Sequence, residues 1–496
     1  MTDQAGTGSS DEDPTLGKKA VRGFAWQVLS FGGNRLVLFI STLILARILD
    51  PRDFGVFAAA LTFTAYLEVL LDFGVGSFLV YDQEEGVTDR VHTAFLVNAA
   101  VTVAITAAAV VTSPLTARLL GAPGQAGVFA VTSLYLILRG AAQLNQSMLV
   151  RDLHFKKQTL INVSGAVGRA ILTVILAFAG LGVWAIVGGF LLGETVNTVL
   201  LWAFVRYRPR LRFRAALARQ MLRFGLGEVA LDLLNALTLN GDYLVIGATI
   251  GDVALGLYSI AFRLADLLIN NALWMFSSIA FPLYSKSRAA GQERINQIMI
   301  RALRLTTLYG FAAGVGLALL SRDLIALLFG HKWAPAVDAM VLLSLAAAAG
   351  SVGYASGPVF PALGRPGALV KLSVPEVVLE LGAFVAVASH GIFWIAMVHL
   401  VGNCVFAVVR IVYVNRILGS TARESARALA PALTIALGMV TFALPVRLAT
   451  TTGLPSLLAI LVAAIAGGVA GAALWGRTVW DEVRGIAGNF RSARSR

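Results

Sequence analysis

The chain has 496 residues, of which 57% are hydrophobic and 14% are charged. Together with a mean hydropathy of +0.78, this composition excludes a water-soluble globular protein and indicates an integral membrane protein. The net charge of +13 is therefore interpreted as a topology signal, with no nucleic-acid partner, and the single cysteine, Cys404, excludes a disulfide framework or a thiolate metal site.

The chain begins with a polar segment, residues 1–22, which we predict to be a disordered cytoplasmic tail. Its first part is acidic and rich in small residues, a composition that cannot bury a core. The segment lacks the basic region and short apolar run of a cleavable signal peptide. We therefore expect the first hydrophobic run to remain as a helix.

Fourteen hydrophobic runs follow the tail. Each is long enough for a helix that crosses a hydrocarbon core, which needs about 20 apolar residues. The predicted fold is an all-α polytopic membrane protein with about 14 transmembrane helices. The runs begin near Phe24, Phe54, Thr93, Gly127, Leu160, Gly182, Phe224, Leu255, Met299, Ala336, Leu369, Gly391, Ala428 and Pro455.

The distribution of Lys and Arg predicts the orientation of these runs. If all fourteen cross the membrane, 30 of the 40 Lys and Arg residues fall on one side, Arg410 among them, six on the other and four inside the runs. Short loops rich in Lys and Arg stay in the cytoplasm, so both termini are expected to be cytoplasmic. The six outer residues are Arg47, Arg52, Arg118, Arg322, Lys332 and Arg447.

Two internal similarities predict a duplication. The segment at 49–60 resembles the segment at 250–261, which pairs Gly55 with Gly256 at an offset of 201 residues. Gly182 pairs with Gly391 at an offset of 209. These similarities predict two homologous six-helix halves in the same orientation. Transporters built from such repeats bind their substrate between the two repeats. The predicted halves are 23–205 and 224–416, with a basic cytoplasmic linker at 206–223, an extra helix pair at 417–476 and a basic cytoplasmic tail at 477–496.

Several segments, in this order along the chain, resemble a known family of membrane proteins. They are Leu45–Phe57, Leu71–Gly76, Arg151–Lys156, Gly180–Ile186, Gly241–Gly247 and Ala254–Ala261. This ordered set resembles bacterial polysaccharide flippases of the Wzx type. These belong to the polysaccharide-transport branch of the multidrug/oligosaccharidyl-lipid/polysaccharide exporter superfamily.

The resemblance implies a function and a location. Such a protein carries undecaprenyl-diphosphate-linked oligosaccharide from the inner to the outer leaflet of the bacterial cytoplasmic membrane. Glycosyltransferases and a glycan polymerase of the same pathway would be its partners. The extra helix pair resembles that of peptidoglycan-precursor flippases, so a flippase of that kind and a multidrug exporter remain alternatives. A glycan polymerase or ligase is disfavoured because the outer loops are short, and we expect no enzyme and no catalytic residue.

Four arginines at membrane depth are the predicted cavity cations for such a substrate. A charge in the membrane centre is costly and usually faces a polar cavity, and a guanidinium donates paired hydrogen bonds to phosphate. Arg35 and Arg263, from opposite halves, are expected to hold the diphosphate. The full set is Arg35, Arg139, Arg169 and Arg263.

Six carboxylates at depth are candidates for ion coupling. Glu376 and Glu380 are four residues apart, as are Glu68 and Asp72, so each pair shares a helix face. Neighbouring buried carboxylates suit movement coupled to a proton or sodium gradient, and no other cofactor is expected. The set is Glu68, Asp72, Asp242, Asp266, Glu376 and Glu380. For His399, a hydrogen bond between helices is favoured over a proton relay.

Proline and glycine residues between the tenth and eleventh runs predict interrupted helices. Interrupted membrane helices can bend when a transporter changes conformation, although a fixed kink is an equal alternative. The residues are Gly357, Pro358, Pro361, Gly364, Pro366 and Pro375.

Overall fold

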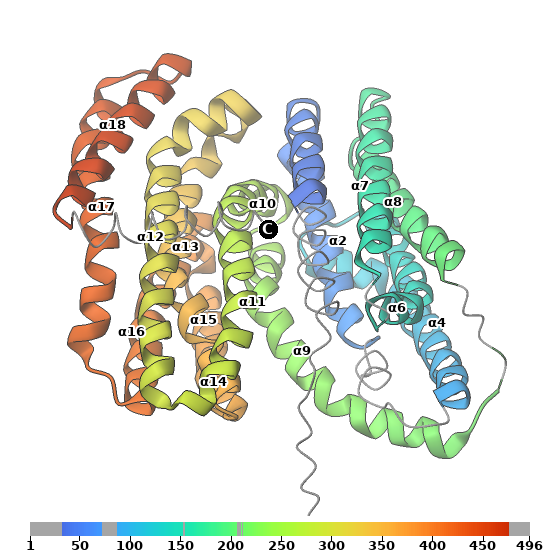
Figure 1. The fold of residues 1–496 in the computed structure, drawn as a ribbon. Coiled ribbons are helices and arrows are strands. Elements are labelled where there is room, and N and C mark those ends of the chain that lie inside the picture. Colours follow the sequence, from blue (N-terminus) through green and yellow to red (C-terminus); the bar gives the residue numbers. More distant parts are fainter. Residues whose placement is uncertain (1–31, 72–86, 152–153, 206–209, 211, 476–496) are drawn as a thin grey trace, which may run out of the picture. The chain divides into compact units, whose positions relative to one another are not determined.

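A computed structural model describes residues 32–71, 87–151, 154–205, 210 and 212–475. These residues form helices and turns, with no strand among them (Figure 1). The predicted all-α membrane fold is thereby confirmed. The polar tail at 1–22, the basic tail at 477–496 and Asp72 lie outside the described residues.

The chain divides into two compact units whose boundaries fall inside helices. Unit 1 consists of Met1–Ile48, Thr64–Ser113 and Gly127–Leu233, and unit 2 of Leu49–Phe63, Pro114–Ala126 and Leu234–Arg496. Two short segments of the predicted first half therefore belong to the unit that contains the second half. The duplication itself stays a prediction.

Among the described residues, unit 1 contains a helix over residues 32–48 and all or part of seven further helices. In its core, α8 packs along α6 and α7, and the indole of Trp202 on α8 donates to the carbonyl of Ala141 on α6 at 3.0 Å. The elements that lie wholly or partly in unit 1 are α2 (Pro51–Val69), α4 (Val87–Leu119), α5 (Ala126–Ser133), α6 (Tyr135–Arg151), α7 (Phe155–Phe178), α8 (Val183–Phe204) and α9 (Ala215–Thr249).

Unit 2 is built around α12 and α13, which pack on each other and on α16 and α17. It also holds the first part of α2 and the end of α9. Its elements are α10 (Asp252–Ala265), the π-helix η1 (Asp266–Asn270), α11 (Asn271–Lys286), η2 (Ser287–Ala290), α12 (Gln292–Leu324), η3 (Ile325–Phe329), η4 (His331–Ala336), α13 (Val337–Ser356), α14 (Val359–Ala362), α15 (Pro366–Val387), η5 (Ala388–His390), α16 (Ile392–Leu418), α17 (Ala422–Ala449) and α18 (Leu454–Ala473).

Ten helical stretches of the described residues are long and apolar enough to cross a membrane. The helix over residues 32–48, the helices α2 and α9, and the run from α10 to α11, where four further spans are predicted, are not among the ten. Each of these four carries charged residues in its sequence, which lowers its hydropathy. The number of fourteen spans therefore stays a prediction.

Two glycines paired by the predicted duplication occupy the same local position. Gly182 precedes α8 with φ 54° and Gly391 precedes α16 with φ 98°. Side chains other than glycine rarely adopt these values. Each glycine lets the chain turn sharply between two helices, which explains why Gly stands at both places.

The predicted interruption between the tenth and eleventh runs is present. α13 ends at Ser356, a single turn forms α14, and α15 starts at Pro366, a first-turn position that suits proline. Gly364 has φ 73°. Pro375 lies inside α15, so the chain breaks before this helix and not within it.

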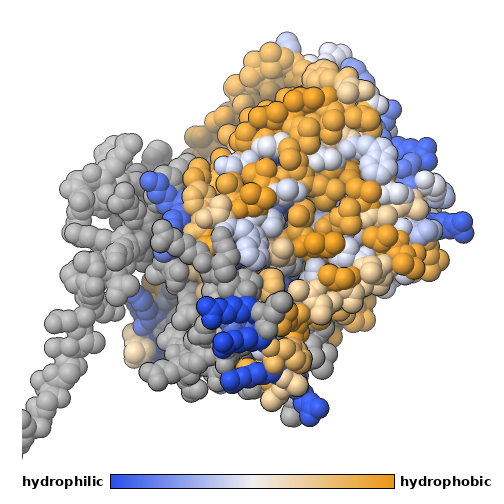
Figure 2. Space-filling view, turned by 90° about the vertical axis from the view of Figure 1, so that its right-hand side faces the viewer, coloured by the Kyte–Doolittle hydropathy of each residue, from blue (hydrophilic) through white to orange (hydrophobic). Residues whose placement is uncertain are grey.

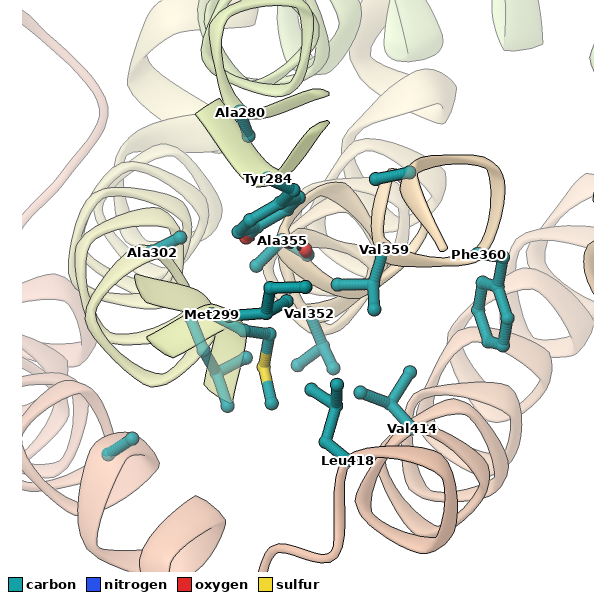
Figure 3. Close-up of a cluster of buried hydrophobic side chains, with 14 residues drawn as sticks. Ala280, Tyr284, Met299, Ala302, Val352, Ala355, Val359, Phe360, Val414 and Leu418 are labelled. Atoms are coloured by element: carbon teal, nitrogen blue, oxygen red, sulfur yellow. Dashed lines mark hydrogen bonds between the residues drawn. The ribbon is translucent and has the colours of Figure 1, made fainter. Parts of the chain in front are cut away.

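A buried hydrophobic cluster lies between helices of unit 2. Figure 3 shows its side chains directed into the space between the helices. At its centre Tyr284 is fully buried, and its hydroxyl donates to the carbonyl of Ala355 at 3.0 Å. The cluster joins α11, α12, α13, α14, α16 and α17, with members such as Met299, Val359 and Val414.

The extra pair, α17 and α18, is fixed to α12 by close packing and by a polar cluster. At the crossing of the pair, a methyl group on Gly438 would overlap the backbone of Gly467, and the reverse also holds. At one end, fully buried Asp323 accepts from the amide of Gly453 at 2.9 Å, and Arg322 donates to the carbonyl of Thr450 at 2.9 Å. Arg447 donates to the carbonyl of Ala318 at 2.6 Å.

Large hydrophobic side chains cover much of the outer surface. One face of the molecule is mostly hydrophobic, and strongly hydrophilic residues gather toward its edges and one end (Figure 2). Within unit 1, exposed hydrophobic residues include Val111 on α4 and Ile171, Ile175 and Phe178 on α7. Such a surface suits contact with lipid and identifies a multi-pass membrane protein.

Candidate functional site

Unit 2 contains a cavity of about 630 Å³. This volume is in the range of small-molecule sites in proteins. Its wall combines aromatic rings, hydroxyl and amide groups, and four ionisable side chains from α15 and α16. The polar and aromatic lining residues are Thr238, Phe262, Asn270, Trp274, Ser277, Ser278, Phe281, Tyr354, Glu376, Glu380, His399, Asn403 and Arg410.

The charged pair Glu376 and Arg410 lies in this wall. A terminal nitrogen of Arg410 on α16 is 2.5 Å from a carboxylate oxygen of Glu376 on α15. The Nε of Arg410 is buried and has no hydrogen-bond partner among the described residues. Arg410 was not among the predicted cavity cations, and the structure places it in the wall of this cavity, on α16; its predicted position on the cytoplasmic side stays a prediction. The one usable signal was an arginine within the apolar run 404–414.

A second polar group joins three helices at the same cavity. The carboxylate of Asp242 on α9 is 3% exposed, and one of its oxygens accepts from the hydroxyl of Tyr258 at 2.8 Å. The same oxygen is 3.0 Å from Nε2 of His399 on α16. Glu380 on α15 lies within electrostatic range of His399. The predicted hydrogen bond of His399 between helices is therefore present, and its partner is a predicted coupling carboxylate.

Arg263 and Asp266 lie next to this cavity, where α10 passes into η1. Asp266 begins the π-helix, and the amide of Asn271 is 3.4 Å from its carboxylate. Arg263 is an exposed residue in the last turn of α10. A π-helical turn inside a longer helix often marks a functional position. Ala265 and Asn270, on either side of this turn, line the cavity.

Two of the predicted cations in unit 1, Arg139 and Arg169, have carboxylate or aromatic partners. Nε of Arg139 on α6 is 2.7 Å from a carboxylate oxygen of Glu68, whose other oxygen accepts from Tyr135 at 3.0 Å. The guanidinium of Arg169 lies 4.9 Å from the ring centre of Phe190 and within electrostatic range of Glu194. Glu68 is thus assigned to an ion pair in this structure.

We expect that neutralising Glu68 alone destabilises the protein. Glu68→Gln leaves the charge of Arg139 without its partner in a membrane helix, and we expect a loss of about 1 kcal/mol because both side chains are partly exposed. The double variant Glu68→Gln/Arg139→Met should recover most of it. Thermal unfolding in detergent measures both. Unchanged stability of Glu68→Gln with lost transport would instead make Glu68 a transport group.

Arg35 and Arg263 belong to different compact units. Arg35 lies in the helix over residues 32–48 of unit 1 and is exposed, whereas Arg263 belongs to unit 2. Their convergence on one diphosphate stays a prediction. The structure instead brings together Asp242, Glu376 and Glu380 of the predicted set around one cavity, with His399 and Arg410 added.

A second feature of unit 2 is a tight crossing of α2 and α10. A methyl group on Gly55 would overlap the carbonyl of Asp252, and one on Gly256 would overlap the carbonyl of Pro51. These are the glycines paired by the predicted duplication, and they contact each other's helices reciprocally. Nε of Arg52 is 3.0 Å from a carboxylate oxygen of Asp252 beside the crossing.

Further contacts extend this crossing. The ammonium of Lys332 donates to the carbonyl of Leu49 at 2.5 Å and lies 3.5 Å from the carboxylate of Asp50. Phe54 packs edge-on against the buried ring of Trp333, with centroids 5.2 Å apart. Two of the six cations predicted to lie outside, Arg52 and Lys332, thus take part in the same contact.

The chain is similar to proteins of polysaccharide biosynthesis. Residues 44–338 match the family described as polysaccharide biosynthesis protein. The succinoglycan biosynthesis transport protein ExoT of Rhizobium meliloti is 31% identical over 333 residues, or 67% of each chain. The lipopolysaccharide biosynthesis protein WzxC of Escherichia coli is 26% identical over 374 residues, or 75% of each chain.

Two solved structures share the fold. The lipid II flippase MurJ, in an inward closed conformation, has a TM-score of 0.73 and 13% identity, covering 92% of this chain and 99% of that one. An inward-facing multidrug resistance transporter of the MATE family has a TM-score of 0.63 and 16% identity, covering 78% of this chain and 94% of that one. At these identities the likeness concerns the fold alone.

Proposed function

The chain belongs to the family of polysaccharide biosynthesis proteins, and on that premise we propose that it moves a lipid-linked oligosaccharide across a membrane. The observation that carries the proposal is the family match over residues 44–338, together with a multi-pass helical fold whose charged cavity lies within unit 2. The substrate we propose is an undecaprenyl-diphosphate-linked precursor of a cell-surface polysaccharide, moved from the inner to the outer leaflet.

The proposed mechanism is alternating access. The reciprocal contact of Gly55 and Gly256 would hold the outer ends of the helices together while the substrate enters from the cytoplasmic leaflet. Release would require that contact to separate. Arg35 and Arg263 are proposed to hold the diphosphate, since guanidinium groups keep their charge and bond phosphate oxygens in pairs.

We also propose that a proton gradient drives this movement through His399. Histidine is the side chain that changes charge between pH 5 and 8, and its Nε2 is 3.0 Å from the buried carboxylate of Asp242. Tyr258 on α10, Glu376 and Glu380 on α15, Arg410 on α16 and Tyr354 on α13 are the other titratable or charged groups around it. A proton gained at His399 would attract the neighbouring carboxylates, Asp242 on α9 and Glu380 on α15. That attraction would weaken if α9 and α16 moved apart, so protonation would favour the conformation in which these helices are close.

The test of the function is a deletion strain. Loss of the protein should cause a polyprenyl-diphosphate-linked oligosaccharide to accumulate in the inner leaflet, and surface polysaccharide to fall. The plasmid-borne gene should reverse both effects. Extraction of lipid-linked glycans and their mass spectrometry identify the accumulated species. A strain with normal lipid-linked glycans and normal surface polysaccharide would contradict the proposal.

Location and orientation belong to the same proposal. We place the protein in the bacterial cytoplasmic membrane with both termini inside, supported by the division of Lys and Arg between the loops. The glycosyltransferases that build the lipid-linked substrate and the polymerase that consumes it are the proposed partners.

A further inference from the structure

The cavity of unit 2 does not have the charge that a diphosphate needs. Arg410 is the only arginine among the described residues that line it, and Glu376 already matches that charge at 2.5 Å. Glu380 adds a second carboxylate to the wall, while His399 is bonded to Asp242. Phosphate recognition relies on an excess of donors with positive charge, so the lining favours an uncharged part of the substrate.

The remaining lining residues suit a sugar. Phe281 on α11 is 43% exposed and borders the cavity, as does Phe262 on α10. Asn270 and Ser277 supply amide and hydroxyl groups. A sugar ring presents apolar C–H faces that pack on aromatic rings and hydroxyl groups that need hydrogen-bond partners.

Arg410 offers a specific donor to such a ligand. Its side chain lines the cavity and is 23% exposed, and one terminal nitrogen pairs with Glu376. A sugar hydroxyl can accept a hydrogen bond from the exposed part of the guanidinium without disturbing that pair. The carboxylate of Glu380 can in turn accept from hydroxyl groups.

From these features, and resting on the proposed function, we infer that the unit 2 cavity is the glycan subsite of the transporter. It holds the sugars next to the diphosphate, with Phe281 as the apolar platform and with Asn403, Glu380 and Arg410 as hydrogen-bonding groups. The lining reaches Pro358 and Pro361, in the loop that the charge pattern assigns to the cytoplasm. The glycan therefore enters from the side on which it is assembled.

The test compares two probes on the purified full-length protein in lipid nanodiscs. One probe is undecaprenyl diphosphate, and the other is undecaprenyl diphosphate carrying a disaccharide of neutral hexoses. Wild type should bind the second probe more tightly. Phe281→Ala should weaken its binding about threefold to tenfold, the range of an aromatic contact, and leave binding of the sugar-free probe unchanged. Phe281→Trp keeps a ring and should keep the preference.

Phe276→Ala is the matched control. Phe276 lies on the same helix and is 39% exposed, but it does not line the cavity, so its loss should change neither affinity. Equal affinity of wild type for the two probes, or equal weakening of both by Phe281→Ala, would overturn the glycan subsite. Neither result would contradict the proposed flippase function, which the deletion strain tests separately.

Discussion

Replacing Gly55 or Gly256 by leucine is expected to abolish most transport. Each side chain would have to occupy the position of a backbone carbonyl on the other helix, so α2 and α10 cannot close on each other. Overpacking of this kind costs about 1–3 kcal/mol, which shifts the equilibrium toward separated helices about fivefold to 150-fold. Transport of lipid-linked oligosaccharide in proteoliposomes measures the loss.

Cross-linking of Arg52→Cys to Asp252→Cys by a short bifunctional thiol reagent, in a Cys404→Ser background, reports closure, because the two native side chains reach each other across the crossing with a 3.0 Å ion pair. Its yield should fall in the leucine variants. Gly382→Leu is the control, since a side chain there meets open space on α15. Transport at the wild-type rate by Gly55→Leu, with normal membrane levels, would show that this crossing is not the gate.

The replacement His399→Gln is expected to uncouple transport from a proton gradient. Glutamine can still donate a hydrogen bond to Asp242 but cannot gain a proton. A gradient equivalent to 100 mV supplies about 2.3 kcal/mol per charge, which corresponds to about fiftyfold accumulation of substrate in the target leaflet. In proteoliposomes with an imposed pH difference, the ratio of substrate between the two leaflets should fall toward one in the variant. Its affinity for the substrate should stay within about threefold of the wild-type affinity.

His390→Gln serves as the control for this experiment, because His390 is exposed on η5 and does not line the cavity. It should leave the response to the pH difference intact. The proton proposal is wrong if His399→Gln still responds fully. It is equally wrong if a sodium gradient at constant pH drives the wild-type protein.

The helices could be predicted well because hydropathy acts locally. Runs predicted to begin near Ala336, Gly391 and Pro455 correspond to helices that begin at Val337, Ile392 and Leu454. The start of α17 at Ala422, earlier than the predicted Ala428, has a local cause. Thr421 caps the helix by accepting from the amide of Glu424 at 3.3 Å, so the charged first turn is helical although it is not apolar.

The candidate site was harder to predict from the sequence because its side chains pair with residues on other helices. Arg410 and Glu376 are 34 residues apart, and His399 and Asp242 are 157 apart. Hydropathy indicates that such residues lie at depth but not which helices adjoin. Arg410 was missed as a cavity residue for a related reason: it lies near the end of α16, and in sequence an arginine at a helix end looks the same whether or not it lines a cavity.

The polar cluster at the end of α17 and α18 also determines when, during synthesis of the chain, Asp323 can gain its full set of hydrogen bonds. Asp323 and its partner Gly453 are 130 residues apart, which a ribosome covers in about 7–26 s at about 5–20 residues per second. During that interval the carboxylate of Asp323 lacks the hydrogen bond from Gly453, although Arg322 lies 3.6 Å from it. The last two helices therefore complete this polar cluster, and a nascent chain halted before them would lack the hydrogen bond from Gly453 to Asp323.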